Sequence, residues 1–171
     1  MDKIKRDRVA IVMGSKSDFP VVKLAIDLLK SFGVEVEVNV ISAHRTPDAA
    51  AEFAKSAEDR GVRVIIGAAG KAAHLPGVIA AYTILPVIGL PIKSSTLDGL
   101  DSLLSIVQMP SGIPVATVAI NGSQNAALLA IQILALGDKA LARDLKEYRS
   151  TMEEQVKLQD EEIRREVGKI N

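Results

Sequence analysis

The side chains that could do chemistry gather in three short segments of the chain. His44 is followed directly by Arg45, and a second histidine, His74, lies in a later segment. An imidazole exchanges a proton near neutral pH, and a guanidinium offers a planar fork of donors suited to a phosphate. Ser15 and Ser17 could add hydroxyls and helix-start amides to an anion site. These residue types indicate a small anion site with one acid–base group.

Each of these segments follows a stretch that we predict to form a β-strand. The apolar run 9–13 ends abruptly at Gly14, as is typical of a strand buried on both faces and followed by a sharp turn. Residues 34–40 alternate valines with polar residues, the pattern of a half-exposed strand near a sheet edge. Residues 62–67 form a third strand. We take the first strand as the centre of the sheet and its turn as one wall of the site.

The remaining elements predict a parallel α/β sheet. Thr46 as N-cap and Pro47 at the first helical position begin a helix that stops at Gly61. Two more strands are expected at 86–91 and 113–120. Further helices are expected at 20–32, 75–82, 100–108, 124–136 and 139–168. Strands that alternate with helices imply right-handed crossovers and favour a three-layer α/β/α sandwich around a five-stranded, flavodoxin-like parallel sheet.

This topology brings three loops to one edge of the sheet, where ligands of open α/β sheets bind. The loops carry Ser15, Ser17 and Asp18, then Ser42, His44 and Arg45, then Gly70, Lys71 and His74. Asp18 accepts hydrogen bonds and suits ribose hydroxyls, although Ser17 or Asp18 could instead only cap the next helix. A lone histidine is more often structural than catalytic. Two histidines at one crevice, one of them beside an arginine, favour catalysis.

Composition narrows the class of protein. The chain has 171 residues, of which 48% are hydrophobic and 3% aromatic, and 21 basic residues balance 21 acidic ones. This suits one domain, residues 1–171, and gives no sign of a nucleic-acid or membrane partner. The absence of cysteine excludes disulfides and thiolate metal sites. Because the charged N-terminus lacks the apolar middle of a signal peptide, we expect a cytoplasmic protein.

The last helix differs from the α/β core of residues 9–137. Residues 138–168 are polar on most faces and carry a thin apolar seam of Leu141, Leu145, Tyr148, Met152, Val156 and Leu158. Such a helix is more stable when packed on a partner than when it stands alone. We expect it to pack on neighbouring subunits, and packing on its own domain is the alternative.

Several familiar sites are absent from the sequence. Gly70-Lys71 is followed by Ala72 rather than Ser or Thr, so it is no P-loop, and no G-x-G-x-x-G follows the first strand. The third strand lacks the terminal aspartate of a phospho-acceptor site, and no G-x-S-x-G elbow exists for acyl transfer. The two histidines lack metal-ligand spacing, so we expect no metal.

Four motifs resemble a known family. They are Gly14-Ser15-x-Ser17-Asp18, Ser42-Ala43-His44-Arg45-Thr46-Pro47, Ala72-Ala73-His74-Leu75-Pro76-Gly77 and LDSLLSIVQMP at 100–110. Together they resemble the N5-carboxyaminoimidazole ribonucleotide mutase family of purine biosynthesis over about residues 9–137. The last helix resembles that family's only in length and place.

The resemblance implies an isomerase that acts on a small-molecule nucleotide. The carboxyl group on the exocyclic nitrogen of an aminoimidazole ribonucleotide would move to the ring carbon through bound carbon dioxide, without metal, ATP or organic cofactor. His44 would be catalytic, protonating the departing nitrogen and later removing the ring proton. Arg45 and Ser17 would hold the phosphate, Asp18 the ribose, and Ser15, Ser42, Ala69 and Gly70 the carboxylate, with Lys71, His74 and Leu75 completing the site. The resemblance also implies a homo-octamer.

Lys71 departs from the resemblance, because the family usually has glycine at this position. The lysine could point away while its backbone amide still serves the site, or it could place a cation beside the migrating carboxylate. Two other functions stay open. One is direct carboxylation of aminoimidazole ribonucleotide by carbon dioxide, and the other is a non-catalytic nucleotide-binding module on the same fold.

Overall fold

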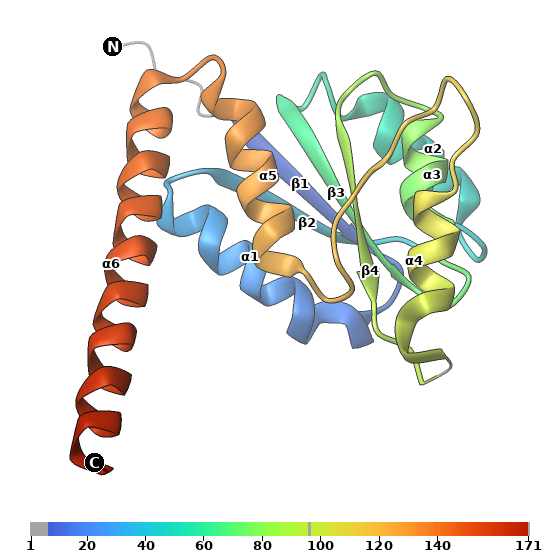
Figure 1. Cartoon of the computed structure of the whole chain (residues 1–171). Coiled ribbons are helices and arrows are strands. Elements are labelled where there is room, and N and C mark those ends of the chain that lie inside the picture. Colours follow the sequence, from blue (N-terminus) through green and yellow to red (C-terminus); the bar gives the residue numbers. More distant parts are fainter. Residues whose placement is uncertain (1–6, 96, 171) are drawn as a thin grey trace.

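The computed structural model describes residues 7–95 and 97–170 and is built on a parallel β-sheet (Figure 1). Five strands lie in the order β2-β1-β3-β4-β5. They are β1 (Arg8–Met13), β2 (Glu35–Val40), β3 (Val62–Gly70), β4 (Val87–Ile92) and β5 (Ala116–Thr117). All neighbouring strands are parallel. The predicted five-stranded sheet with the flavodoxin-like order is therefore confirmed.

Helices lie on both sides of this sheet (Figure 1). On one side are α1 (Phe19–Ser31) and α5 (Ser123–Ala135), with α6 (Lys139–Ile170) beyond them. On the other side are α2 (Pro47–Ser56), α3 (Leu75–Ala80) and α4 (Leu100–Val107). The short 3₁₀ helix η1 (Lys16–Asp18) leads into α1, and the turn η2 (Leu97–Gly99), whose residues have positive φ, leads into α4. The three layers confirm the predicted α/β/α sandwich.

Strand β1 divides the apolar core into two halves. Its side chains alternate between the faces of the sheet, as they must in any strand. Val9, Ile11 and Met13 pack into the core under α1 and α5. Ala10 and Val12 pack into the core under α2, α3 and α4. All five are at most 1% exposed, which explains why the sequence of this strand is apolar throughout.

The predicted centre of the sheet is wrong by one strand. β1 pairs with β2 and β3, and β2 is an edge strand, so the central position belongs to β3. β3 also runs further than predicted. The sequence predicts the strand only to residue 67, but Ala68, Ala69 and Gly70 extend the ladder by pairing with Leu90, Pro91 and Ile92 of β4. The reversal of strand order still falls between β1 and β3, as the site prediction requires.

The fifth strand is much shorter than the predicted 113–120. Only Ala116 and Thr117 pair regularly with β4, opposite Ile88 and Gly89. Pro114 has no N–H to donate to a ladder. Beyond the pair, the Val118 N–H donates to the carbonyl of Gly89 at 3.1 Å, so the segment follows β4 without continuing as a strand.

Two helix ends also differ from the prediction. α2 ends at Ser56, and residues 57–61 form turns that close at Gly61, where φ is +79°. Thr46 occupies the N-cap position of α2, but its side chain makes no capping hydrogen bond. α3 ends at Ala80 rather than at Tyr82.

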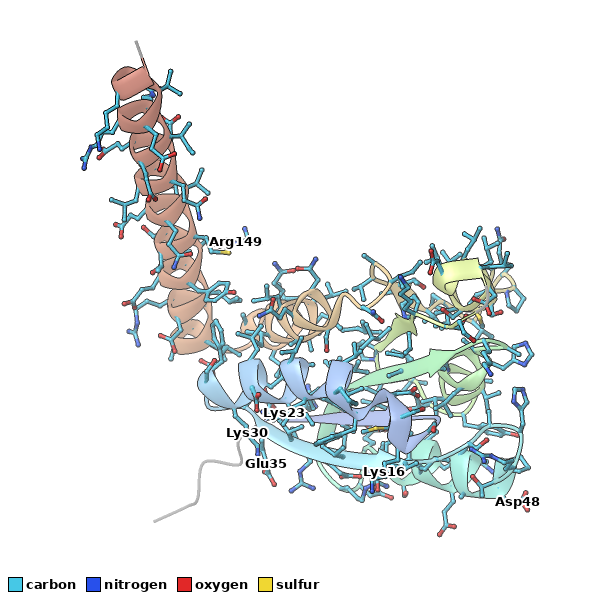
Figure 2. The ribbon with its side chains drawn as sticks, turned by 90° about the horizontal axis from the view of Figure 1, so that it is seen from below. Lys16, Lys23, Lys30, Glu35, Asp48 and Arg149 are labelled. Atoms are coloured by element: carbon cyan, nitrogen blue, oxygen red, sulfur yellow. The ribbon has the colours of Figure 1, made fainter. Side chains whose placement is uncertain are left out.

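Helix α6 begins on the body of the protein and projects beyond it (Figures 1 and 2). Leu141 and Leu145 are buried in the core under α1 and α5, and the rings of Phe32 and Tyr148 meet edge to face at 5.5 Å. From Met152 onward the seam is uncovered, and Val156 is 64% exposed. Across the part of the chain that the structure describes, no helix is both long and apolar enough to cross a membrane.

Candidate active site

A cavity of about 660 Å³ opens at the carboxyl edge of the sheet. The ends of β1, β2, β3 and β4 all contribute to its walls. Its lining residues are Gly14, Ser15, Ser17, Asp18, Ser42, Ala43, His44, Arg45, Ala69, Gly70, Lys71, Ala72, Leu75, Ile92, Lys93, Ser94 and Ser95. The strand order β2-β1-β3 therefore brings the three predicted loops into one crevice.

The loop after β1 presents hydroxyls at the start of a helical segment. Gly14 donates its N–H to the carbonyl of Ala68 at 3.1 Å, which holds the turn against β3. Ser15 is the N-cap of η1, and its Oγ accepts from the N–H of Ser17 at 3.3 Å and from the Ser17 hydroxyl at 2.8 Å. These contacts hold the Ser15 and Ser17 hydroxyls in place at the start of a helical segment. A bound anion could accept a hydrogen bond from one of these hydroxyls in place of its present partner.

Among the described residues that line the cavity, Asp18 is the only one with a carboxylate, and only 8% of its surface is exposed. Burial raises the pKa of this carboxyl above its ordinary value, while hydrogen bonds from the Ser17 side chain and the Ser15 backbone partly oppose the increase. The Ser17 hydroxyl lies 3.3 Å from Asp18 Oδ1. A buried carboxylate with few partners is suited to accept hydrogen bonds from ligand hydroxyls.

The loop after β2 is closed by Thr46 and Ser42. The Thr46 hydroxyl accepts from the Ser42 N–H and donates to the Ser42 carbonyl, both at 3.0 Å, which explains why it does not cap α2. The Ser42 hydroxyl in turn accepts from the backbone N–H of Arg45 at 3.2 Å and from its Nε at 3.4 Å. The loop thus holds His44 and Arg45 at the mouth of the cavity, where both are exposed.

The two histidines form a pair. His44 Nε2 and His74 Nδ1 lie 2.9 Å apart, and the rings meet at 84° with centroids 5.0 Å apart. His74 is held in place by its own backbone, since its N–H donates to the carbonyl of Ala72 and its carbonyl accepts from Val78. One ring must donate and the other accept, so each imidazole determines the tautomer of the other.

The end of β3 forms the cavity floor. Gly70 lies so close to β4 that an added Cβ would be 3.3 Å from the carbonyl oxygen of Ile92. Lys71 follows with φ of +56° and is exposed. Ala69 and Leu75 are buried and supply an apolar wall.

The sequence prediction missed a fourth segment, Lys93 to Ser95, which also lines the cavity. Lys93 Nζ pairs with Asp98 at 3.1 Å, and the Ser94 hydroxyl donates to the Asp101 carboxylate at 3.0 and 3.1 Å. The available signal was positional, because this polar segment follows the fourth predicted strand and every strand end of a parallel sheet meets the same edge.

The structure gathers nearly all the predicted site residues. Ser15, Ser17, Asp18, Ser42, His44, Arg45, Ala69, Gly70, Lys71 and Leu75 line the cavity. His74 is not part of the lining and joins the site through His44. Within residues 7–95 and 97–170, no group of three or more His, Cys, Asp or Glu could hold a metal ion. The individual roles of these residues stay predictions.

The fold and the crevice define a flavodoxin-like α/β protein with a polar ligand site at the point where the strand order reverses. The chain belongs to the AIR carboxylase family, whose model matches residues 8–155.

Curated relatives and a solved structure support this membership. The N5-carboxyaminoimidazole ribonucleotide mutase of Thermotoga maritima is 58% identical over 149 residues, 87% of either chain. That of Pyrococcus horikoshii is 58% identical over 154 residues, 90% of this chain and 87% of its own. The crystal structure of PurE from Treponema denticola superposes with a TM-score of 0.84 at 33% identity, covering 92% of this chain and 98% of that chain.

Proposed function

We propose that this protein is an N5-carboxyaminoimidazole ribonucleotide mutase, an isomerase of purine biosynthesis. The observation that carries the proposal is the hydrogen-bonded pair of His44 and His74, next to Arg45 at the mouth of the cavity. The family model and relatives of that name, 58% identical over most of the chain, support it.

The substrate would bind with its phosphate on Arg45 and Ser17 and its ribose hydroxyls on Asp18. A guanidinium suits a phosphate because its planar donors match two oxygens at once. Ser15 and Ser42, with the backbone of Ala69 and Gly70, would surround the carboxyl group. Leu75 adds an apolar surface that keeps water from the reacting end.

His44 would handle the proton of the reaction. When the bond between the exocyclic nitrogen and the carboxyl carbon breaks, carbon dioxide leaves and the nitrogen takes a proton from the imidazole. The electron-rich ring carbon then attacks the retained carbon dioxide, and the imidazole recovers a proton from that carbon. Proton and carboxyl group are both conserved, so the reaction is an isomerisation. Catalysis depends on confinement and orientation of the two fragments.

His74 would act as a positioning residue in this scheme. Its Nδ1 contact at 2.9 Å fixes the ring plane and tautomer of His44. This contact supports a positioning role for His74.

The decisive test separates the mutase from its two alternatives. The purified protein is supplied with the N-carboxylated nucleotide in buffer stripped of bicarbonate, and in parallel with the uncarboxylated nucleotide plus bicarbonate. We expect rapid formation of 4-carboxy-5-aminoimidazole ribonucleotide in the first reaction. Turnover confined to the second would identify a direct carboxylase, and nucleotide binding without turnover in either would identify a binding module.

We also propose that residues 1–171 form one domain and that α6 packs on neighbouring subunits in a homo-octamer. Beyond the body, apolar side chains of α6 are strongly exposed, namely Val156 by 64%, Ile163 by 58% and Val167 by 53%. Such apolar area on a projecting helix favours burial against another copy. A cytoplasmic location completes the proposal, since a phosphorylated nucleotide substrate does not cross membranes unaided.

Light scattering tests the assembly. We expect a mass near eight times 18.2 kDa for the natural chain. The double variant Val156→Glu and Ile163→Glu should lower this mass, whereas Glu154→Lys changes a charge on the face of the same helix opposite Val156 and Ile163 and should leave it unaltered. A monomeric natural chain would refute the assembly proposal and leave the mutase proposal standing.

A further inference from the structure

Lys71 occupies an unusual backbone position in the cavity wall. It is the first residue after β3, it lines the cavity, and its φ is +56°. Side chains with a Cβ are sterically disfavoured there, and glycine would be the unstrained choice. A lysine kept in such a conformation at a ligand site points to a functional use of its side chain.

The charges around the cavity distinguish Lys71 from the other cations. Arg45, Lys71 and Lys93 line the cavity together with the carboxylate of Asp18. Lys93 is already paired with Asp98 at 3.1 Å. Among residues 7–95 and 97–170, Lys71 has no ion-pair partner within 4.0 Å, and neither does Arg45. The site therefore offers two uncompensated cations to a ligand.

Arg45 and Lys71 lie in different loops around the cavity. Arg45 follows β2 and Lys71 follows β3, and β1 lies between those strands. Two inter-strand spacings separate their strand ends by about 10 Å. A nucleoside monophosphate whose base carries a carboxylate has one anionic group at each end, and an extended ligand of this kind could meet one cation with each.

We propose that Lys71 is a specificity-determining residue that binds the carboxylate on the base of the nucleotide. This rests on the proposed function and adds a contact by which the protein would tell carboxylated nucleotides from the uncarboxylated one. The ammonium donates a charge-assisted hydrogen bond to the carboxylate. The uncarboxylated nucleotide has no group to accept it and gains nothing from the lysine.

The test compares two ligands across three variants. Calorimetry measures the Kd of 4-carboxy-5-aminoimidazole ribonucleotide and of 5-aminoimidazole ribonucleotide. Lys71→Met keeps the length of the side chain without the charge and should weaken binding of the carboxylated nucleotide by about tenfold. It should change the Kd of the uncarboxylated one by less than about twofold. Lys71→Arg keeps the charge and should restore most of the affinity for the carboxylated ligand.

Lys30→Met is the matched control. Lys30 lies on the α6 side of the body, far from Asp48, which follows the site loop at the start of α2 (Figure 2). This variant removes a lysine charge away from the cavity and should leave both affinities unaltered. Thermal melting of all variants verifies that each one folds.

Two outcomes would overturn the inference alone. Equal loss of affinity for both ligands would show a general effect on the site, and no loss for either would show that the ammonium points elsewhere. If the natural protein bound neither nucleotide and catalysed no interconversion, the proposed function would fail and the inference with it.

Discussion

Tight turns with positive φ occur at both ends of the strands of the sheet, but different residue types form them at the amino edge and at the carboxyl edge. At the amino edge, the sharp turns that precede β2, β3 and β5 are made by glycines with positive φ: Gly33 (+72°), Gly61 (+79°) and Gly112 (+97°). At the carboxyl edge, positive φ is carried by residues with side chains: Lys71 (+56°), Leu97 (+50°), Asp98 (+53°) and Asn121 (+55°), with Gly99 (+96°) beside them.

This difference shows where the molecule accepts backbone strain. Glycine adopts such turns at little steric cost, so the amino edge is unstrained. Lys71 and Asp98 retain charged side chains in the same backbone region, and Lys71 lines the cavity. Strain of this kind persists only where the surrounding structure enforces it, and it gathers at functional sites. The comparison predicts that substitutions at the carboxyl edge of the sheet alter function, whereas substitutions at the amino edge alter stability.

The largest effect is expected for His44→Asn at the carboxyl edge. Loss of the acid–base group should lower kcat about a thousandfold. Binding of the product nucleotide should be largely kept, because Arg45 and Asp18 are untouched. Steady-state kinetics and calorimetry measure the two quantities separately. Unchanged turnover would show that His44 takes no part in the reaction, and it would contradict the prediction that substitutions at the carboxyl edge alter function.

Arg45→Ala should act on binding. Removal of the guanidinium loses about 2 kcal/mol of charge-assisted hydrogen bonding to the phosphate, which corresponds to roughly a thirtyfold increase in Kd. The matched control is Arg63→Ala, near the amino end of β3, where Arg63 is exposed and forms an ion pair with Asp7 at 3.9 Å. Similar binding by both variants would contradict the phosphate role of Arg45.

Two substitutions, one at the amino edge and one at the carboxyl edge of the sheet, test the comparison of backbone strain. Gly33→Ala should lower the free energy of unfolding by about 1 kcal/mol, because an added Cβ meets no atom within 4 Å and only the left-handed conformation is disfavoured. Lys71→Gly should raise it by about 0.5 kcal/mol, since strain is released but a flexible residue is introduced. Urea unfolding measures both, and equal signs would refute the contrast.

The smallest effect is a pH dependence at Asp18. Burial raises the pKa of this carboxyl in the folded state. A raised folded pKa contributes stability below the unfolded pKa, and this stability is lost as the pH rises through the folded pKa. Asp18→Asn cannot titrate, so its unfolding free energy relative to the natural chain should be higher at pH 7 than at pH 4. A constant difference between the two pH values would argue against the shift.

The sequence predicted the elements better than their lengths. The apolar run of β1, the valine alternation of β2 and the glycine stop at Gly61 are local patterns, and the structure contains each element near its predicted place. β5 was overestimated because apolar composition alone does not show whether a neighbour continues the ladder. β3 was underestimated because small residues such as Gly70 look like a loop until β4 lies beside them.

The candidate site likewise contains features that the sequence predicted and features that it could not predict. His44, Arg45 and the serines could be chosen from residue type and from their place after strands. The 2.9 Å contact between His44 and His74 could not be chosen, since it depends on how far two loops reach across β1. Lys93 was missed because β4 was not recognised as part of the wall.

By itself, the sequence determined which segments are strands and helices, their order, and the residue types at each strand end, because periodicity and turn chemistry act between residues that are neighbours in the chain. Only the tertiary structure decided which strand is central, where the ladders stop and which side chains meet in the cavity. These depend on pairing between distant segments, and a hydrogen bond or ion pair changes with ångström-scale shifts that no local pattern records.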